Sequence, residues 1–461
     1  MKNFNKWRTY MDKVVSPQSY IDFGYYYLIS AALQRRVWCP PDHARVYANM
    51  FVILVGEPGL GKGVVIKPVS EILRHYKLPN PSVNGAAKPE GLTEEQLVIK
   101  KAVEESNYEL ASGEQMKFDA KKGEIQNKEE PLLIPMAADA TTFEALIRAL
   151  AKSIRKQDYT AYDEKLQKNV IKIYTHSSLC FSLEEISSLF RKKSEDVVKL
   201  LLNGYDCGDY TYDTKTQGRD GIKRCCLNFL GGTTPGFIRN VFDDKILDDG
   251  FSSRTFFLFE SKNRKKNFFI PELTADQYQC KQDIIKHVGE VLKLYGPVII
   301  EPTDRQWLED WIQTEERSRS NTSGKLSGYY SRKNLHIIKL GMAIHFGESL
   351  DMHIPRSAFE RAMEVLAVQE KKMHYALDFN GKNPLFDCAK KCTRYLVQNG
   401  ARTRKELLVE LFPDLPNGAA SLDEVLEYLT TTTQISMVSK PNSVGTLVNQ
   451  YEICQEKVAI A

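Results

Sequence analysis

The 461-residue sequence predicts an α/β fold in which a mostly parallel sheet lies between two layers of helices. Three observations predict this fold. A short apolar strand runs directly into a glycine-rich turn, later apolar strands each end in polar residues, and helical segments alternate with these strands. Because the chain is 42% hydrophobic, it can bury a substantial core.

The overall composition narrows the classes of protein only slightly. A formal net charge of +4 neither requires nor excludes nucleic acid, so any basic patch has to be local. Nine cysteines without paired metal-ligand spacing predict reduced structural thiols rather than a zinc site. No apolar run has the length of a membrane span and the first residues do not open a signal peptide, so we expect a cytoplasmic protein with no membrane partner.

The first elements are a helix and a strand. Residues 16–36 predict a largely apolar helix, and residues 49–55 predict a buried strand that runs into the turn. The turn and the start of the next helix contain Gly56, Glu57, Pro58, Gly59, Leu60, Gly61, Lys62, Gly63 and Val64. In this pattern the glycines let backbone N–H groups surround a polyphosphate, and the lysine reaches its outer phosphates. We therefore predict a nucleotide-binding site.

Two acidic residues end the next well-defined strand. A charged segment at about 90–130 predicts a solvated helical insertion, and residues 143–151 predict a capped helix. Residues 178–183 then predict an apolar strand. Glu184 and Glu185 follow it directly. A carboxylate pair beside a phosphate loop can hold Mg²⁺ with its first member and orient the attacking water with its second. The alternative is a surface helix that begins with two solvated glutamates.

Gly63 departs from the phosphate-loop pattern, which has Ser or Thr after the lysine to hold Mg²⁺. Without that hydroxyl, Mg²⁺ requires an extra water or closer help from Glu184. We expect nucleotide binding to survive, whereas slower turnover and a binding-only switch remain two alternatives. The remaining polar residues at the strand ends favour an active site.

The third and fourth strands also carry candidate residues. Residues 226–230 lead into Thr233 and Thr234, whose side chains can contact a γ-phosphate or the attacking water. The alternative for Thr234 is a helix N-cap before Pro235. Arg254 opens an apolar strand, where packing explains an arginine poorly and charge neutralisation in a neighbouring subunit explains it better.

A polar ribbon precedes the third strand, at about residues 207–224. Its alternating Tyr and Thr residues and its glycines predict a β-hairpin. Lys215, Arg219 and Lys223 can contact phosphates, and Tyr212 can stack on bases. An ordinary solvent-exposed hairpin is the alternative.

The rest of the chain is mainly helical until the final unit. Helices are predicted at 275–294, 303–318, 331–345, 355–377, 385–398 and 403–411, and a further helix is predicted to open with the capping box of Ser421 and Glu424. Strands at 435–438 and 446–453 then form a hairpin. Three helices followed by a hairpin is the winged-helix order. Residues 421–430 are acidic and lack Lys and Arg, so we expect this unit to dock on protein rather than on DNA.

The order of phosphate loop, acidic pair, Gly-Gly-Thr-Thr-Pro turn and Gly-Phe-Ser-Ser-Arg strand resembles the AAA+ ATPases of the hairpin-bearing helicase clade. It is most similar to the primase–helicase-like P-loop proteins of phages and plasmids, and more distantly to minichromosome-maintenance and superfamily 3 helicases. The similarity covers roughly residues 16–377. It implies ATP and Mg²⁺ as cofactors and an AAA+ three-layer P-loop core with an α-helical lid.

The resemblance also implies residue roles. Lys62 would be the Walker A lysine, Glu184 and Glu185 the Walker B pair with Glu184 on Mg²⁺, Thr234 the sensor-1 residue and Arg254 a trans arginine finger. It further implies a hairpin before the sensor strand that grips one DNA strand.

The sensor-2 arginine is the weakest match. Arg332 is our choice for it, and Arg319 and Lys333 are nearby competitors.

We divide the chain into an N-terminal helical segment (1–48), the ATPase core (49–260), the lid (261–380) and a winged-helix domain (381–461). The expected function is that of an ATP-dependent, ring-forming DNA helicase or translocase. We expect a homo-oligomer, a hexamer, that acts on single-stranded DNA in phage or mobile-element replication. The expected location is then the bacterial host cytoplasm, with a separate primase or other replication protein as a partner. The alternative is an ATP-switched loader or remodelling protein without unwinding activity.

Overall fold

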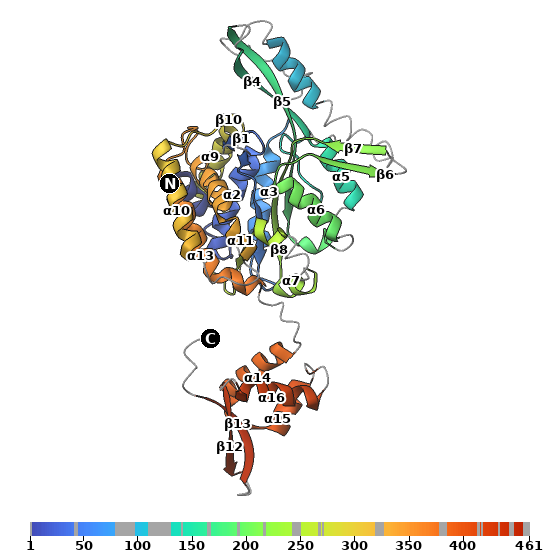
Figure 1. Ribbon diagram of the computed structural model, residues 1–461, viewed down its shortest axis with the longest axis vertical. Coiled ribbons are helices and arrows are strands. Elements are labelled where there is room, and N and C mark those ends of the chain that lie inside the picture. Colours follow the sequence, from blue (N-terminus) through green and yellow to red (C-terminus); the bar gives the residue numbers. More distant parts are fainter. Residues whose placement is uncertain are drawn as a thin grey trace. The chain divides into compact units, whose positions relative to one another are not determined.

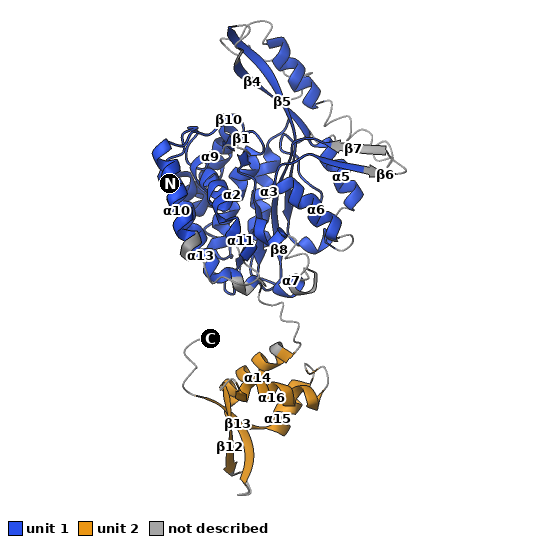
Figure 2. Cartoon of the chain, viewed as in Figure 1, with its two compact units in different colours: residues 1–379 blue, residues 380–461 orange. Residues whose placement is uncertain are grey.

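The computed structural model describes residues 2–454 with internal gaps. The gaps are residues 41–44, 79–96, 109–130, 140–141, 164–166, 191–193, 215–217, 242–249, 266–268, 270–271, 319–326, 378–384, 413–414, 416–417, 432–433 and 442–446. The chain forms two compact units, Met1–Phe379 and Asn380–Ala461 (Figure 2). Within the described part of the chain, none of the helices combines the length and apolar character needed to cross a bilayer.

A five-stranded sheet forms the centre of the first unit, and it confirms the predicted α/β class (Figure 1). In spatial order its strands are β4 (Ile154–Asp163), β5 (Lys168–Leu183), β8 (Cys225–Thr233), β3 (Phe51–Val55) and β9 (Thr255–Phe259). The last four are parallel, and β4 runs antiparallel to β5. Every residue of β3 and β8 is buried, as expected for parallel strands covered on both faces.

Helices surround this sheet. They are α1 (Lys2–Tyr10), α2 (Gln18–Leu33), α3 (Gly63–His75), α5 (Phe143–Lys152), α6 (Ser194–Tyr205), α7 (Pro235–Val241), α9 (Ala275–Val291), α10 (Pro302–Ser318), α11 (Ser327–Ser331), α12 (Lys333–Phe346) and α13 (Arg356–Leu377). Short 3-10 turns lie at η1 (Ile186–Ser188) and η3 (Ser252–Arg254). A small separate sheet joins β1 (Val37–Cys39), β2 (Val46–Tyr47) and β10 (Gly296–Pro297).

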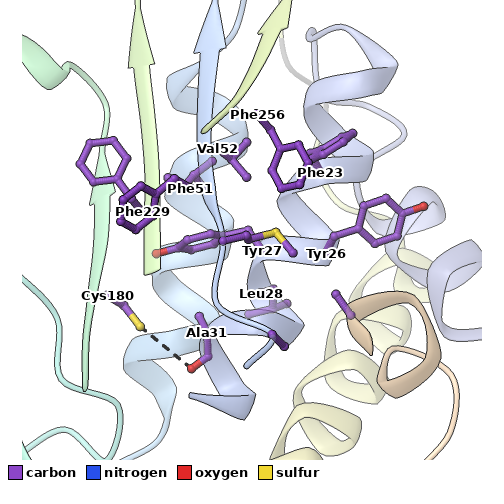
Figure 3. Packing of buried hydrophobic residues seen from close by; sticks show 14 of the residues in the cluster. Phe23, Tyr26, Tyr27, Leu28, Ala31, Phe51, Val52, Cys180, Phe229 and Phe256 are labelled. Carbon is purple, nitrogen blue, oxygen red and sulfur yellow. Dashed lines mark hydrogen bonds between the residues drawn. The ribbon is translucent and has the colours of Figure 1, made fainter. Parts of the chain in front are cut away.

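The aromatic helix α2 packs directly against the sheet (Figure 3). Phe23 and Phe256 are 5.7 Å apart between ring centroids, and Tyr27 lies near the strand residues Phe51 and Phe229. One hydrophobic cluster extends from Phe4 to Ala376. The N-terminal segment and the helices after residue 261 therefore share a core with the central sheet, within the compact unit 1–379.

Two regions differ from the sequence prediction. Strand β5 begins at Lys168, well before the predicted 178, because its first half pairs with β4 in an antiparallel arm. Part of the charged insertion, residues 97–108, is a helix that packs on this arm. Asn107 exchanges two 2.9 Å hydrogen bonds with the backbone of Lys156, so this part of the insertion is docked rather than free in solvent.

A two-stranded ribbon lies where the polar hairpin was predicted. Its strands are β6 (Tyr210–Thr214) and β7 (Gly218–Ile222), which pair antiparallel from Tyr210 opposite Ile222 to Thr214 opposite Gly218. The ribbon precedes β8 along the chain. It is separate from the five-stranded sheet.

The second unit has its own core. It contains α14 (Leu385–Asn399), β11 (Arg402–Thr403), α15 (Arg404–Leu411), α16 (Ala419–Thr431), β12 (Ile435–Pro441) and β13 (Leu447–Ile453). Thr403 and Glu406 form the predicted capping box at the start of α15. The predicted start at Ser421 is wrong, because α16 begins at Ala419 and Ser421 is buried inside it. Three helices and a hairpin follow one another in the expected order.

Candidate functional site

The glycine-rich turn connects β3 to α3 at the carboxyl end of the central strands. Gly59 and Gly61 both have φ of +81°, a left-handed conformation that favours glycine. A Cβ on Gly61 would also collide with the carbonyl oxygen of Val15. The turn therefore has backbone requirements that few other residues satisfy, and the N-terminal segment packs directly on it.

Lys62 points its ammonium group back into the turn. Its Nζ donates to the carbonyl oxygens of Gly56 at 2.6 Å and Glu57 at 3.1 Å. Burial lowers the pKa of Lys62, and the negative charges of Glu185 and Glu57 oppose that shift. A lysine held over a ring of backbone groups next to an acidic residue is positioned to exchange these carbonyls for phosphate oxygens.

The acidic pair lies at the same edge of the sheet as the turn. Strand β8 lies between β3 and β5, so its end separates Lys62 from Glu184. A Cβ on Gly232 in β8 would lie 2.5 Å from the Glu184 carbonyl oxygen and 3.3 Å from Lys62 Cβ. The two predicted halves of the site are therefore close neighbours, across a single glycine.

Glu184 and Glu185 both face solvent at an open cleft of about 620 Å³. Glu185 precedes η1, and its carboxylate accepts a long 3.4 Å hydrogen bond from Ser187 N. Glu184 points toward α3, where a Cβ on Gly63 would lie 2.6 Å from its Oε2. Ser182, Lys67 and other polar residues complete the lining.

The Glu184 carboxylate can serve as one ligand of a Mg²⁺ ion whose other ligands are phosphates and waters. Among the described residues there is no cluster of three or more His, Cys, Asp or Glu side chains that would hold a metal ion alone. Mg²⁺ is commonly bound by one or two carboxylates together with phosphates and waters. Glu184 beside the phosphate loop offers such a carboxylate.

Thr234 caps a helix in the structure. Its Oγ1 accepts a 3.2 Å hydrogen bond from Phe237 N at the start of α7, which is the alternative that the sequence left open. The neighbouring Thr233 is fully buried, and its carbonyl oxygen accepts a hydrogen bond from Gly56 N. Thr234 is half-buried at the end of β8, so capping does not remove it from the site edge.

Arg254 and Arg332 lie at the opposite edge of the sheet from the glycine-rich turn. Arg254 precedes Thr255, which pairs with Phe51 at the amino end of β3, whereas the loop follows Val55. The intervening strand spans about 13 Å. Neither arginine is therefore at the glycine-rich turn of the same chain.

A single carboxylate binds both arginines. Asp206 accepts hydrogen bonds from Arg254 Nε at 3.3 Å and Nη2 at 2.6 Å, and from Arg332 Nη1 at 3.4 Å. The Arg254 side chain is 12% exposed and that of Arg332 30% exposed. Lys333, a competitor for the role of Arg332, is instead engaged by Glu315 and Glu370 at 2.9 Å each. Arg319 lies outside the described residues.

The predicted DNA contacts are described only in part. Lys215 and the side chain of Arg219 lie outside the described residues, and Lys223 is exposed directly after β7. Tyr212 is half-buried, with its ring 5.4 Å from that of Phe143 in an edge-on contact. Tyr212 therefore helps to hold the ribbon against α5 as well as being a candidate for base stacking.

Sequence reasoning missed several residues around the turn. Val15 contacts Gly61, and Asn263 donates to the Gly59 carbonyl at 3.4 Å. Arg264 donates to the carbonyls of Met11, Asp12 and Val14. No local signal identified these contacts, since each joins segments far apart in the sequence.

Known proteins give no independent identification. No family model matches the chain, and no curated protein matches it significantly. Functional conclusions therefore depend on the residues and geometry described above.

Proposed function

We propose that this chain is an ATPase of the AAA+ type that works as a head-to-tail homo-oligomer. The observation that carries the proposal is the meeting of Lys62, Gly63 and the exposed pair Glu184–Glu185 at one edge of the sheet. Phosphoryl transfer needs mainly positioning and charge stabilisation, and this edge offers a phosphate cradle, a cation and two carboxylates.

In this proposal each side chain has one task. Lys62 binds the outer phosphates, Glu185 orients the attacking water and accepts its proton, and Glu184 holds Mg²⁺. Mg²⁺, when bound, would neutralise charge on the phosphate oxygens. Thr234 stays at the end of β8, between the two halves of the site, as the sensor-1 candidate.

The two arginines support assembly. Because Arg254 and Arg332 lie at the far edge of the sheet, they can complete a nucleotide site only in a neighbouring copy. Contacts between opposite edges are heterologous, and such contacts close into rings when the rotation permits. A hexamer is the closed form that we propose.

We propose single-stranded DNA as the substrate along which the ring moves, in phage or mobile-element replication. Support comes from the β6–β7 ribbon and from Lys223 beside it, with Lys215 and Arg219 as further candidates from sequence. The second unit would be a winged-helix domain that positions the ring or docks a partner such as a primase. Its α16 is acidic, which disfavours phosphate contact.

A second candidate function is an ATP-switched loader or remodelling protein without unwinding activity. Gly63 favours it, since the loop lacks the usual hydroxyl ligand. The acidic α16 favours it as well. Asp423 on its surface pairs with Arg404, so this arginine is neutralised and does not add to a basic face.

The test combines nucleotide binding, DNA-stimulated hydrolysis and unwinding of forked DNA. Lys62→Ala should weaken binding of ATP by about 100-fold or more, because it removes a charge-assisted contact to phosphate. Lys199→Ala, at an exposed lysine on α6, is the matched control and should bind like wild type. Intact DNA-stimulated hydrolysis in Lys62→Ala would refute the site. Nucleotide-dependent partner binding without strand separation would select the loader.

A further inference from the structure

Gly63 and Glu184 fit each other in a way that the usual phosphate-loop residues would not. An ideal Cβ on Gly63 would lie 2.6 Å from Glu184 Oε2, 3.4 Å from its Cδ and 3.7 Å from its Cγ. The first of these distances is too short for a real contact. The Glu184 carboxylate therefore occupies the space in which a serine or threonine side chain would stand.

We propose that the Glu184 carboxylate replaces the missing hydroxyl of the phosphate loop as the metal-facing oxygen beside α3. This inference rests on the proposed nucleotide site. A glutamate extends about 1.5 Å further than the commoner aspartate, since it has one more methylene. The longer side chain needs a residue without a Cβ opposite it, and Gly63 meets that need.

The two oxygens of Glu184 have different neighbours. Oε2 faces Gly63, and Oε1 is 3.4 Å from Nζ of Lys67 on the next turn of α3. Lys67 and Glu184 are 63% and 53% exposed, so their ion pair is weak and easily exchanged. Lys67 therefore restrains Glu184 only weakly, and the carboxylate can exchange this contact for a bound cation.

The chemistry of the exchange is favourable. Mg²⁺ prefers hard oxygen ligands and accepts carboxylates together with phosphates and waters. A carboxylate brings a full negative charge, whereas a hydroxyl brings only a dipole. The Gly63–Glu184 pair therefore supplies an oxygen in the place where the pattern expects one, and Gly63 is a specific adaptation rather than a defect.

A double-mutant cycle tests the pairing through metal-dependent binding. The readout is the affinity of a non-hydrolysable ATP analogue with Mg²⁺ divided by its affinity in EDTA, measured by calorimetry. Gly63→Ser should displace the Glu184 carboxylate, and Glu184→Asp should withdraw it, so each should lower this ratio by about tenfold. The double variant should recover most of the ratio, because a serine hydroxyl and a shorter carboxylate fit together. Affinity in EDTA should change little.

Gly63→Ala is the matched control. It adds the Cβ but no oxygen, so it should lower the ratio like Gly63→Ser, and adding Glu184→Asp should not rescue it. Thermal melting of every variant checks folding. Only the end of a half-exposed side chain has to move, so all should melt near wild type.

Additive losses in the Ser–Asp cycle would overturn the inference, as would a higher ratio for Gly63→Ser alone. Recovery of the ratio in the double variant Gly63→Ala with Glu184→Asp would also overturn it, since the effect would then be steric only. Failure of the wild-type protein to bind the analogue under either condition would instead refute the proposed function. The two failures are therefore distinguishable.

Discussion

The two edges of the central sheet differ in what they carry. The carboxyl edge has the glycine-rich turn with Lys62, two exposed glutamates, and Lys67 beside Glu184. The amino edge has Arg254 and Arg332, both held by Asp206. The first edge combines a glycine-rich turn with carboxylates, and the second holds two arginines on one carboxylate. The two groups of charged residues thus lie at opposite ends of the same strands, as the proposed head-to-tail assembly requires.

The largest expected effect tests whether Arg254 contributes to ATP hydrolysis in a neighbouring subunit. Arg254→Ala should lower ATP turnover by about 1000-fold, as expected for an arginine that stabilises transition-state charge, with little change in nucleotide affinity. Steady-state kinetics and equilibrium binding measure the two quantities. Arg356→Ala, at a half-exposed arginine of α13 that pairs with Glu360, is the control and should retain turnover.

Mixing variants decides between action within and between subunits. Equal amounts of the Lys62→Ala and Arg254→Ala proteins should regain turnover, because about a quarter of the interfaces in a random mixture carry both intact residues. An inactive mixture whose exchange of subunits is demonstrated would contradict action in trans.

The next prediction concerns Glu185 at the carboxyl edge and its effect on ATP turnover. Glu185→Gln should lower turnover by about 100-fold or more while ATP still binds, because the amide cannot accept the proton of the attacking water. Single-turnover hydrolysis and binding measurements separate these outcomes. If Glu185→Gln retains turnover and Glu184→Gln loses it alone, the roles of the two residues are the reverse of those proposed.

A smaller effect concerns the carboxylate that holds the arginines. Asp206→Asn should release Arg254 and Arg332 from a charged partner and so change turnover by about threefold to tenfold, with affinity for ATP unchanged. The direction is informative. A rise would mean that Asp206 restrains the arginines before assembly, and a fall would mean that it positions them. No change in turnover would contradict a functional link.

The smallest effect is the acid sensitivity of the amino edge. Burial lowers the pKa of His336 to about 3, and its Nε2 donates to the Ser253 carbonyl beside Arg254. Between pH 6.5 and 3 the unfolded chain binds a proton that the folded chain excludes, so the free energy of unfolding falls as pH falls through this window.

His336→Gln keeps a donor but cannot titrate. Denaturant unfolding should therefore show a shallower loss of stability between pH 6.5 and 3 for this variant than for wild type. Parallel pH profiles would contradict the assignment. His176 is also buried and neutral, and it contributes equally in both proteins.

Local sequence signals were sufficient for the carboxyl edge. An apolar run followed by glycines and a lysine marked β3 and its turn, and an apolar run ending in two glutamates marked the end of β5. These features depend on neighbours in sequence. The α/β class followed from the same signals.

The remaining features depend on contacts between distant segments. Asp206 had no local motif, and the Gly63–Glu184 contact joins two elements that are far apart in the chain. The β4–β5 arm was missed because its first half has no continuously buried face to give an apolar pattern. The N-terminal segment and the helices after residue 261 share one hydrophobic cluster with the central sheet, and only packing shows this.

Helix α2 has a consequence for the thermodynamics of ligand binding. The hydroxyl of Tyr20 donates to the carbonyl of Val55 at 2.6 Å, and that of Tyr27 donates to the carbonyl of Phe181 at 2.5 Å. One helix thus fixes the spacing between β3, which leads to the glycine-rich turn, and β5, which leads to the acidic pair. If the proposed nucleotide binds between these strands, little conformational entropy is lost inside the chain, because their spacing is already fixed.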